Sequence, residues 1–316
     1  MERFNHTQKA KTPEKVSRLR KHWDDYLREC VILFCVFFVS ITLARVPLIY
    51  MDGGTAISVV FAPLAISILL KKNHNFPISE TLQSLGVPMG LLFGAIGLVV
   101  IFESQIQRGE MMVGEAVGPT ISIMLLSVFY GVLMHAIGYL VSDKAHISEA
   151  SLPISSKNYF VCLGCFLVAI AYVVFQVTVL YGLSWWLFSL QPILLCLSIS
   201  SLFIFSKRRT GLAENLADAS LMIVVVGVML SLIELYGNLN PVNAPFIQPQ
   251  LFFEISNYAH YCLMYGAATY ISSFLMSLRT NEFQDINFKA RNWHMLEAFS
   301  FYVFMTLAAP GIFELV

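Results

Sequence analysis

The sequence predicts an all-α, polytopic helical membrane protein with about nine transmembrane helices, arranged as two parallel four-helix repeats plus one extra C-terminal helix. Three observations predict this fold class. The composition is 57% hydrophobic and only 13% charged, with a mean hydropathy of +0.69, unlike that of an ordinary soluble domain. Apolar runs long enough to cross a bilayer, which takes roughly 20 residues, recur along the chain. Similar residues also recur, in the same order, in its first and second halves.

The apolar runs give nine candidate spans separated by short polar segments. They lie near residues 31–50, 54–70, 86–103, 116–142, 158–181, 184–206, 217–237, 252–278 and 294–314. The segment before the first span is too long and too polar for a cleavable signal peptide, so we expect that span to remain in the mature protein. The spans divide the chain into a cytoplasmic basic segment that can form an amphipathic helix, two four-span units and a C-terminal span, at residues 1–29, 30–145, 146–280 and 281–316.

Lysine and arginine residues set the expected orientation, because cytoplasmic loops retain them and translocated loops are depleted of them. The loops assigned to the cytoplasm contain Lys71, Lys72, Lys144, Lys157, Lys207, Arg208, Arg209, Arg279, Lys289 and Arg291. The loops on the opposite side contain only Arg45 and Arg108. We therefore expect a multi-pass membrane protein with a cytoplasmic N-terminus and a C-terminus on the opposite side of the membrane.

The remaining composition excludes several function classes. The formal net charge is zero and the basic residues mostly border spans, so no nucleic-acid partner is expected. The six cysteines lie inside or beside apolar spans, where a thiol behaves as a small apolar side chain. The sequence has no zinc-protease, nucleophile-elbow or P-loop motif and no cluster of metal ligands. We expect neither an enzyme nor a bound cofactor or metal.

The evidence for an internal repeat comes from residues of spans five to eight that match residues of spans one to four. The matched pairs are Cys35 and Cys165, Pro63 and Pro192, Gly94 and Gly227, Tyr130–Gly131 and Tyr265–Gly266, and Lys144 and Arg279. Because four is an even number of spans, both units would enter from the same side and the repeats would be parallel. Coincidence among leucine-rich helices is the alternative explanation.

Small and polar residues inside the spans are the candidates for packing and ion movement. Glycines three or four apart let membrane helices approach closely, and we expect this role for Gly90, Gly94, Gly97, Gly131, Gly227 and Gly266. Polar side chains in a membrane helix mark candidate functional sites. In span 116–142 they are Ser127, Tyr130 and His135, which share a broad face and can serve either as a proton path or as packing residues. Glu234 and His260 can approach each other in the second unit, as an ion pair or as part of a path.

Spans two to four resemble the MotA/TolQ/ExbB proton-channel family. The third span reads Gly-Leu-Leu-Phe-Gly-Ala-Ile-Gly-Leu-Val from Gly90, and the fourth contains Leu-Leu-Ser-Val-Phe-Tyr-Gly ending at Gly131. Both are similar to the last two helices of that family, as is the Gly-Gly-Thr that begins at Gly53 and is followed by Pro63. The resemblance covers roughly residues 45–145 and has a faint repeat in the second unit. Gly94 stands where the family often has threonine.

The last span resembles the single helix of ExbD- and MotB-type partners. It ends in Phe-Met-Thr-Leu-Ala-Ala-Pro at Pro310, and Glu297 lies one residue from the position of the partner's proton-carrying aspartate. The resemblance implies that Glu297 carries protons. Glu297 also lies close enough to Lys289 and Arg291 to extend back to the cytoplasmic surface, which is the alternative.

The resemblance implies a proton or sodium channel subunit of the bacterial inner membrane, with a periplasmic C-terminus, that couples ion flow to work on a partner. Each chain would bring two ring-type units and one plug-type helix, so we expect a homo-oligomer of two or three chains, or a complex with a MotB/ExbD-like protein, in the lipid bilayer. The short segment 71–85 leaves no room for the large cytoplasmic region of flagellar stators. A secondary transporter with parallel repeats and a non-conducting membrane scaffold or assembly subunit remain alternatives.

The channel hypothesis makes one geometric demand. Span 294–314 must pack against the third and fourth spans of both units, near Ser127 and Tyr265. A last span that packs only at the periphery would contradict it.

Overall fold

The structure is a computed structural model that describes residues 53–74, 76–108, 113–141, 154–181, 188–206, 211–238, 249–280, 282–283 and 286–308. The segment 1–29 and the span 31–50 predicted from the sequence lie outside the described residues. The described helices are α2 (Gly53–His74), α3 (Ile78–Arg108), α4 (Val113–Leu140), α5 (Ser156–Tyr181), α6 (Leu190–Ser206), α7 (Leu212–Gly237), α8 (Pro249–Thr280) and α9 (Phe288–Ala308). No strand occurs in this part of the chain.

The all-α fold class is confirmed for the described residues, and each predicted span from 54–70 onward overlaps one helix. Among the described residues, three helical segments are long and apolar enough to cross a membrane: Ile78–Glu103, Ser156–Phe175 and Leu212–Gly237. Met124–Leu140 and Leu190–Phe205 are shorter apolar helices. Association with a membrane through apolar helices follows from these segments, and the total of nine crossings stays a prediction.

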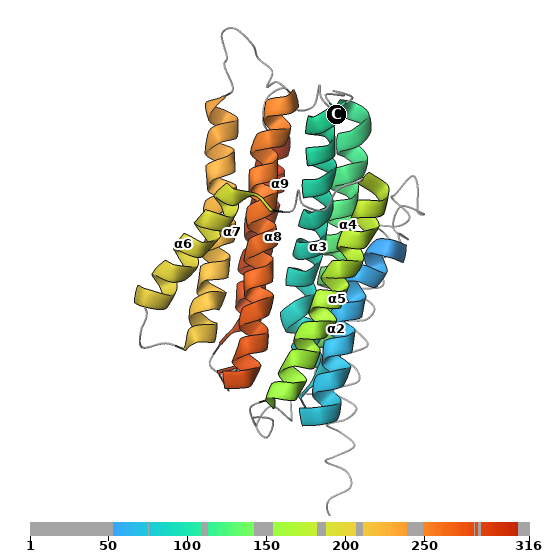
Figure 1. Cartoon of the computed structure of the whole chain (residues 1–316), viewed down its shortest axis with the longest axis vertical. Coiled ribbons are helices and arrows are strands. Elements are labelled where there is room, and N and C mark those ends of the chain that lie inside the picture. The colour runs from blue at the N-terminus through green and yellow to red at the C-terminus, as the bar shows by residue number, and fades with distance from the viewer. Residues whose placement is uncertain are drawn as a thin grey trace, which may run out of the picture. The chain divides into compact units, whose positions relative to one another are not determined.

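Residues Gly53–Val316 form one compact unit of helices that lie side by side, as Figure 1 shows. The colour gradient shows that successive helices from α2 to α8 run in opposite directions. Helices α8 and α9 are antiparallel too, because the Tyr270 hydroxyl meets the Phe288 carbonyl at one end and the Tyr302 hydroxyl meets the Ser256 carbonyl at the other. Corresponding helices of the two predicted repeats therefore point the same way.

The two halves of the unit show the same order of helix contacts. In the first half α3 and α4 share the largest interface, followed by α2 with α3 and then α2 with α4. In the second half the order is α7 with α8, then α6 with α7, then α6 with α8. A duplicated four-helix unit would give this pattern, although the duplication itself remains a prediction.

Glycine positions determine how closely α3 and α4 approach. A Cβ atom on Gly86 would lie 2.5 Å from the Gly131 carbonyl oxygen, and one on Gly90 would lie 2.6 Å from the Ser127 carbonyl oxygen. A Cβ atom on Gly94 would meet the Met124 and Ser127 side chains at 3.2 and 3.3 Å. The two backbones thus touch over several turns, as in other close membrane-helix pairs. Gly97 is different, because no atom lies within 4 Å of its Cβ position.

Helices α7 and α8 also approach through glycine, but against side chains. A Cβ atom on Gly227 would collide with the Cβ and Sγ atoms of Cys262, and one on Gly266 would lie 2.5 Å from a methyl group of Val224. The two halves join where α3 packs along α8 and where α5 packs against α2 and α3. Helix α3 therefore contacts α2, α4, α5, α8 and α9, and 94% of its apolar window is buried. It begins directly after Pro77 and has Glu80 in its first turn, both of which favour a helix N-terminus.

Candidate functional site

Helix α9 contacts the third and fourth helices of both halves. The contacts are Asn292 with Gln83 of α3, Trp293 with His135 of α4, Met305 with Tyr236 of α7, and Tyr302 with His260 of α8. One side of α9 is buried against these helices and the other side is exposed. Its buried face carries Asn292, Met295, Phe299, Tyr302 and Thr306, spaced at helical intervals.

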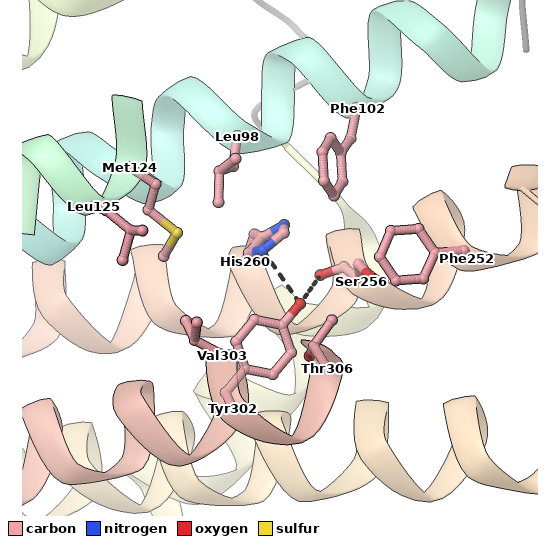
Figure 2. A pocket seen from close by; sticks show the side chains of 10 residues that line it. All are labelled: Leu98, Phe102, Met124, Leu125, Phe252, Ser256, His260, Tyr302, Val303 and Thr306. Atoms are coloured by element: carbon pink, nitrogen blue, oxygen red, sulfur yellow. Dashed lines mark hydrogen bonds between the residues drawn. The ribbon is translucent and has the colours of Figure 1, made fainter. Parts of the chain in front are cut away.

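A small cavity of about 30 Å³ lies between α3, α4, α8 and α9, as Figure 2 shows. Its lining is mostly apolar and consists of Leu98, Phe102, Met124, Leu125, Phe252, Ser256, His260, Tyr302, Val303 and Thr306. We call it the His260 cavity. A space of this size holds about one water molecule when polar groups border it.

His260 is the ionisable group that lines this cavity, and it is only 3% exposed. Its Nε2 lies 3.2 Å from the Tyr302 hydroxyl, which donates to the Ser256 carbonyl at 3.4 Å. Because a tyrosine hydroxyl has one hydrogen, donation to Ser256 requires Nε2 to carry the proton of the His260 ring. Nδ1 is then an acceptor in the neutral ring, and none of the described residues offers it a hydrogen bond.

A carboxylate of α3 binds two residues that flank this histidine on α8. The Oε1 atom of Glu103, near the C-terminal end of α3, accepts hydrogen bonds from Asn257 Nδ2 at 2.9 Å and from the Tyr261 hydroxyl at 3.3 Å. Phe102, the residue before it, packs against the His260 ring with ring centroids 5.1 Å apart. An acid held by two donors and a buried histidine therefore occupy neighbouring positions on the α3–α8 interface.

A second group of buried polar residues surrounds Asn292, which precedes Tyr302 by ten residues on α9. Pro88 of α3 explains why a polar side chain is needed there. Proline has no N–H, so Pro88 inside α3 leaves the Ser84 carbonyl without its helical donor. The Asn292 side-chain amide donates instead, to the carbonyl oxygens of Ser84 at 3.1 Å and Gln83 at 2.6 Å. His135 Nδ1 also lies 2.6 Å from the Gln83 oxygen and must carry the ring proton there. We call these four polar residues the Asn292 cluster.

The Asn292 cluster contains several unsatisfied groups. Gln83 Nε2, Ser84 Oγ and Asn292 Oδ1 are buried and have no hydrogen-bond partner among the described residues. Such groups are costly unless water reaches them, so an internal water molecule is expected between them. Each end of the buried face of α9 therefore packs against a histidine of a neighbouring helix and lies beside groups able to bind water.

Ion pairs hold the start of α9 in place. Lys289 Nζ lies 2.9 Å from Glu80 of α3, and Arg291 binds Asp218 of α7 through two nitrogens, the closer at 2.7 Å. The two basic residues that the sequence offered as neighbours of Glu297 are thus engaged elsewhere. Glu297 pairs instead with His294 on its own helix at 3.0 Å, and its side chain is 72% exposed.

The structure brings some predicted site residues together and separates others. His135 lies in the Asn292 cluster and His260 lines the His260 cavity, whereas Ser127 is buried between α3 and α4, beside Gly90 and Gly94. Tyr130 lies partly buried against the apolar core. Tyr265 lies on the α6 side of α8, where its hydroxyl accepts from the Ser189 N–H at 3.3 Å. Glu234 is exposed on α7 and does not contact His260.

Residues of the site that sequence reasoning missed are Asn292, Tyr302 and the pair of Glu103 with Asn257. The signal for Asn292 was present, because Pro88 within an apolar span demands a replacement donor for the Ser84 carbonyl. The partner that supplies this donor lies more than 200 residues away in the chain. No local pattern identifies such a partner.

The described residues contain no group of three or more histidine, cysteine, aspartate or glutamate side chains placed to hold a metal ion. In comparisons with known proteins, no family model matches the chain, and no curated protein or solved structure matches it either.

Proposed function

We propose that this chain is a proton-translocating subunit of the bacterial inner membrane, of the MotA/TolQ/ExbB type, whose proton path follows the buried face of α9. The observation that carries this function is His260, an ionisable side chain buried among apolar helices with one ring nitrogen unpartnered at a cavity. Ionisable residues in membrane helices are costly and usually serve transport. A histidine ring can take up a proton at one nitrogen and release one from the other.

The chemistry of the His260 cavity suits a relay. A water molecule in the cavity can donate to Nδ1 while Nε2 holds its proton toward Tyr302. Protonation of Nδ1, transfer of the Nε2 proton to the Tyr302 hydroxyl oxygen and release of the original Tyr302 hydroxyl proton to water would together move one proton across the ring. The Glu103 carboxylate, held by Asn257 and Tyr261, can take up a proton and release it again at the end of α3 where sequence places the periplasm.

The path is closed in this structure. Between Tyr302 and Asn292, which lie about 15 Å apart along the helix at 1.5 Å per residue, the buried face of α9 carries Met295 and Phe299. These apolar side chains separate the two polar groups and prevent a continuous chain of water. Conduction therefore requires α9 to move against α3 and α8, which links proton flow to motion as expected for this type of subunit.

We assign the proton-carrying step to His260 rather than Glu297. The Glu297 side chain points away from α3, α4, α7 and α8, whereas His260 is enclosed by α3, α8 and α9. His135 is the corresponding candidate at the other end of the path, because its Nδ1–H is bound to the Gln83 carbonyl and its Nε2 remains able to accept a proton. Its ring packs against Trp293 of α9.

The test is proton flux into vesicles that contain the purified full chain and a pH-sensitive dye, driven by a potassium diffusion potential. We expect flux above that of protein-free vesicles, and His260→Asn should lower it at least about tenfold, the factor given by 1.4 kcal/mol in a barrier. Asparagine keeps hydrogen bonding but cannot carry a proton. Ser231→Ala is the matched control, because Ser231 is a buried α7 residue whose hydroxyl binds the Ile255 carbonyl at 2.8 Å, and it does not line the cavity. Absence of flux, or equal flux in His260→Asn and the wild type, would refute the proposal.

A further inference from the structure

Basic side chains from three helices lie at the end of the bundle where α2 and α8 end and α5 begins. They are Lys71 and Lys72 near the C-terminal end of α2, Lys157 in the first turn of α5 and Arg279 in the last turn of α8. All four residues are exposed in the described part of the chain. We call this set the basic rim.

Contacts between the three helix ends hold the basic rim together. The Ile154 N–H, just before α5, donates to the Leu278 carbonyl of α8 at 3.1 Å. The Phe76 ring, just after α2, packs against the Phe283 ring, just after α8, with ring centroids 4.9 Å apart. Helices α2 and α5 also pack against each other in opposite directions, as Figure 1 shows. The end of α2, the start of α5 and the end of α8 therefore lie beside one another.

The charges of the basic rim are not neutralised within the described part of the chain, where none of its four residues forms an ion pair. Arg279 lies over the Tyr159 ring, 5.4 Å from its centroid, a contact that positions the guanidinium group and leaves its charge in place. By contrast, Lys289 at the same end of the bundle is bound by Glu80 at 2.9 Å. The basic rim therefore offers its positive charge to an anion of another molecule.

An exposed apolar stripe leads along α2 to the basic rim. The stripe, which we call the α2 stripe, consists of Ile57, Phe61, Leu64 and Ile68, whose exposed fractions lie between 37% and 59%. Intervals of four, three and four residues place them on one face of the helix. Lys71 and Lys72 continue this face, because they follow Ile68 by three and four residues. An apolar surface that ends in uncompensated cations matches a phospholipid, whose acyl chains are joined to a phosphate.

We propose that the basic rim and the α2 stripe bind an anionic phospholipid, with the phosphate at the basic rim and an acyl chain along the α2 stripe. Lysine and arginine bind phosphate through charge-assisted hydrogen bonds. Basic residues at a membrane surface strengthen the binding of anionic lipids about fivefold each, equivalent to about 1 kcal/mol. A zwitterionic lipid carries its own cation beside the phosphate and would leave the charge of the basic rim uncompensated. Free phosphate would leave the α2 stripe uncovered.

The lipid site does not depend on proton conduction, and it is tested by direct binding. The purified full chain in a neutral detergent is titrated against phosphatidylglycerol labelled on an acyl chain, and fluorescence anisotropy gives the dissociation constant. Phosphatidylcholine with the same chains and label is the reference. We expect phosphatidylglycerol to bind at least about tenfold more tightly, equivalent to 1.4 kcal/mol. Inorganic phosphate at the same concentration should not displace it.

Variants of the three exposed lysines make the result specific. The triple variant with Lys71→Gln, Lys72→Gln and Lys157→Gln should lose the preference for phosphatidylglycerol, and each single change should weaken it by up to about fivefold. The matched control replaces the same three residues with arginine, which keeps the charge and should keep the preference. Equal binding of both lipids by the wild type, a preference that survives the triple glutamine variant or disappears in the arginine variant, or displacement by inorganic phosphate would overturn the proposal.

Discussion

The hairpins α3–α4 and α7–α8 occupy equivalent places in the two halves of the molecule but differ in what they pack and what they carry. In the first, glycine faces backbone, as with Gly86 against the Gly131 carbonyl. In the second, glycine faces a side chain, as with Gly227 against Cys262. When the two halves are aligned by matching Tyr130–Gly131 with Tyr265–Gly266, His260 aligns with Leu125. Both residues line the same cavity. The comparison teaches that at the His260 cavity the first half contributes apolar side chains and the second half contributes the histidine.

The largest expected effect is on the backbone contact of the first hairpin. Gly131→Ala would place a methyl group 2.5 Å from the Gly86 oxygen and 3.0 Å from the Gly90 Cα, with no side chain able to move aside. We expect a loss of about 3 kcal/mol or more in unfolding free energy, the upper range for overpacking, measured by denaturant titration in detergent. The control is Gly97→Ala, which has open space and should stabilise the helix by up to about 1 kcal/mol. Equal loss in both variants would show that the backbone contact does not exist.

A somewhat smaller effect is expected in the second hairpin, and it should be reversible. Gly227→Ala collides with the Cys262 side chain, whereas the nearest backbone atom, the Cys262 Cα, is 3.7 Å away. We expect a loss of about 2 kcal/mol, within the range for overpacking. Because Cys262→Gly removes the colliding atoms, the double variant should be more stable than the sum of the two single changes predicts. Strict additivity in the same denaturant titration would contradict this difference between the halves.

The third prediction concerns the hydrogen bonds between α9 and α3. Asn292→Ala should cost about 1–3 kcal/mol, because it leaves the Ser84 carbonyl buried without a donor. The loss should shrink when Pro88→Ala returns a helical N–H to that carbonyl. A double-mutant cycle in detergent measures the coupling between the two positions. Zero coupling energy would mean that Asn292 does not replace the missing helical donor.

Apolar runs and glycine spacing were sufficient to predict the described helices and the close α3–α4 contact, because both depend on residues near one another in sequence. Gly97 fits the same spacing, but no atom lies within 4 Å of its Cβ position, since spacing alone does not show which glycines face a neighbouring helix. The residues of the site were harder to predict from the sequence. Five residues separate Glu297 from Tyr302, which at 3.6 residues per turn places them about 140° apart on the helix. Periodicity therefore indicates that they face different ways, but not which one faces the bundle.

Pairing across the halves could not be predicted from local pattern. His260 meets Tyr302, and Glu103 meets Asn257, because α3, α8 and α9 assemble around one another. The expected approach of Glu234 to His260 relied on similar depth in the membrane, and depth does not determine the side of a helix. The resemblance of the last span to a partner helix directed attention to Glu297, whereas the buried face of α9 carries Tyr302 instead.

The most direct measurement compares proton flux in vesicles for the wild type, His260→Asn and Glu297→Gln at equal protein content. If the path follows the buried face of α9, flux falls in His260→Asn and persists in Glu297→Gln, because the first residue lines the cavity and the second lies outside the bundle. Flux that persists in His260→Asn and disappears in Glu297→Gln would place the proton carrier on the exposed face and contradict the path proposed along α3, α8 and α9.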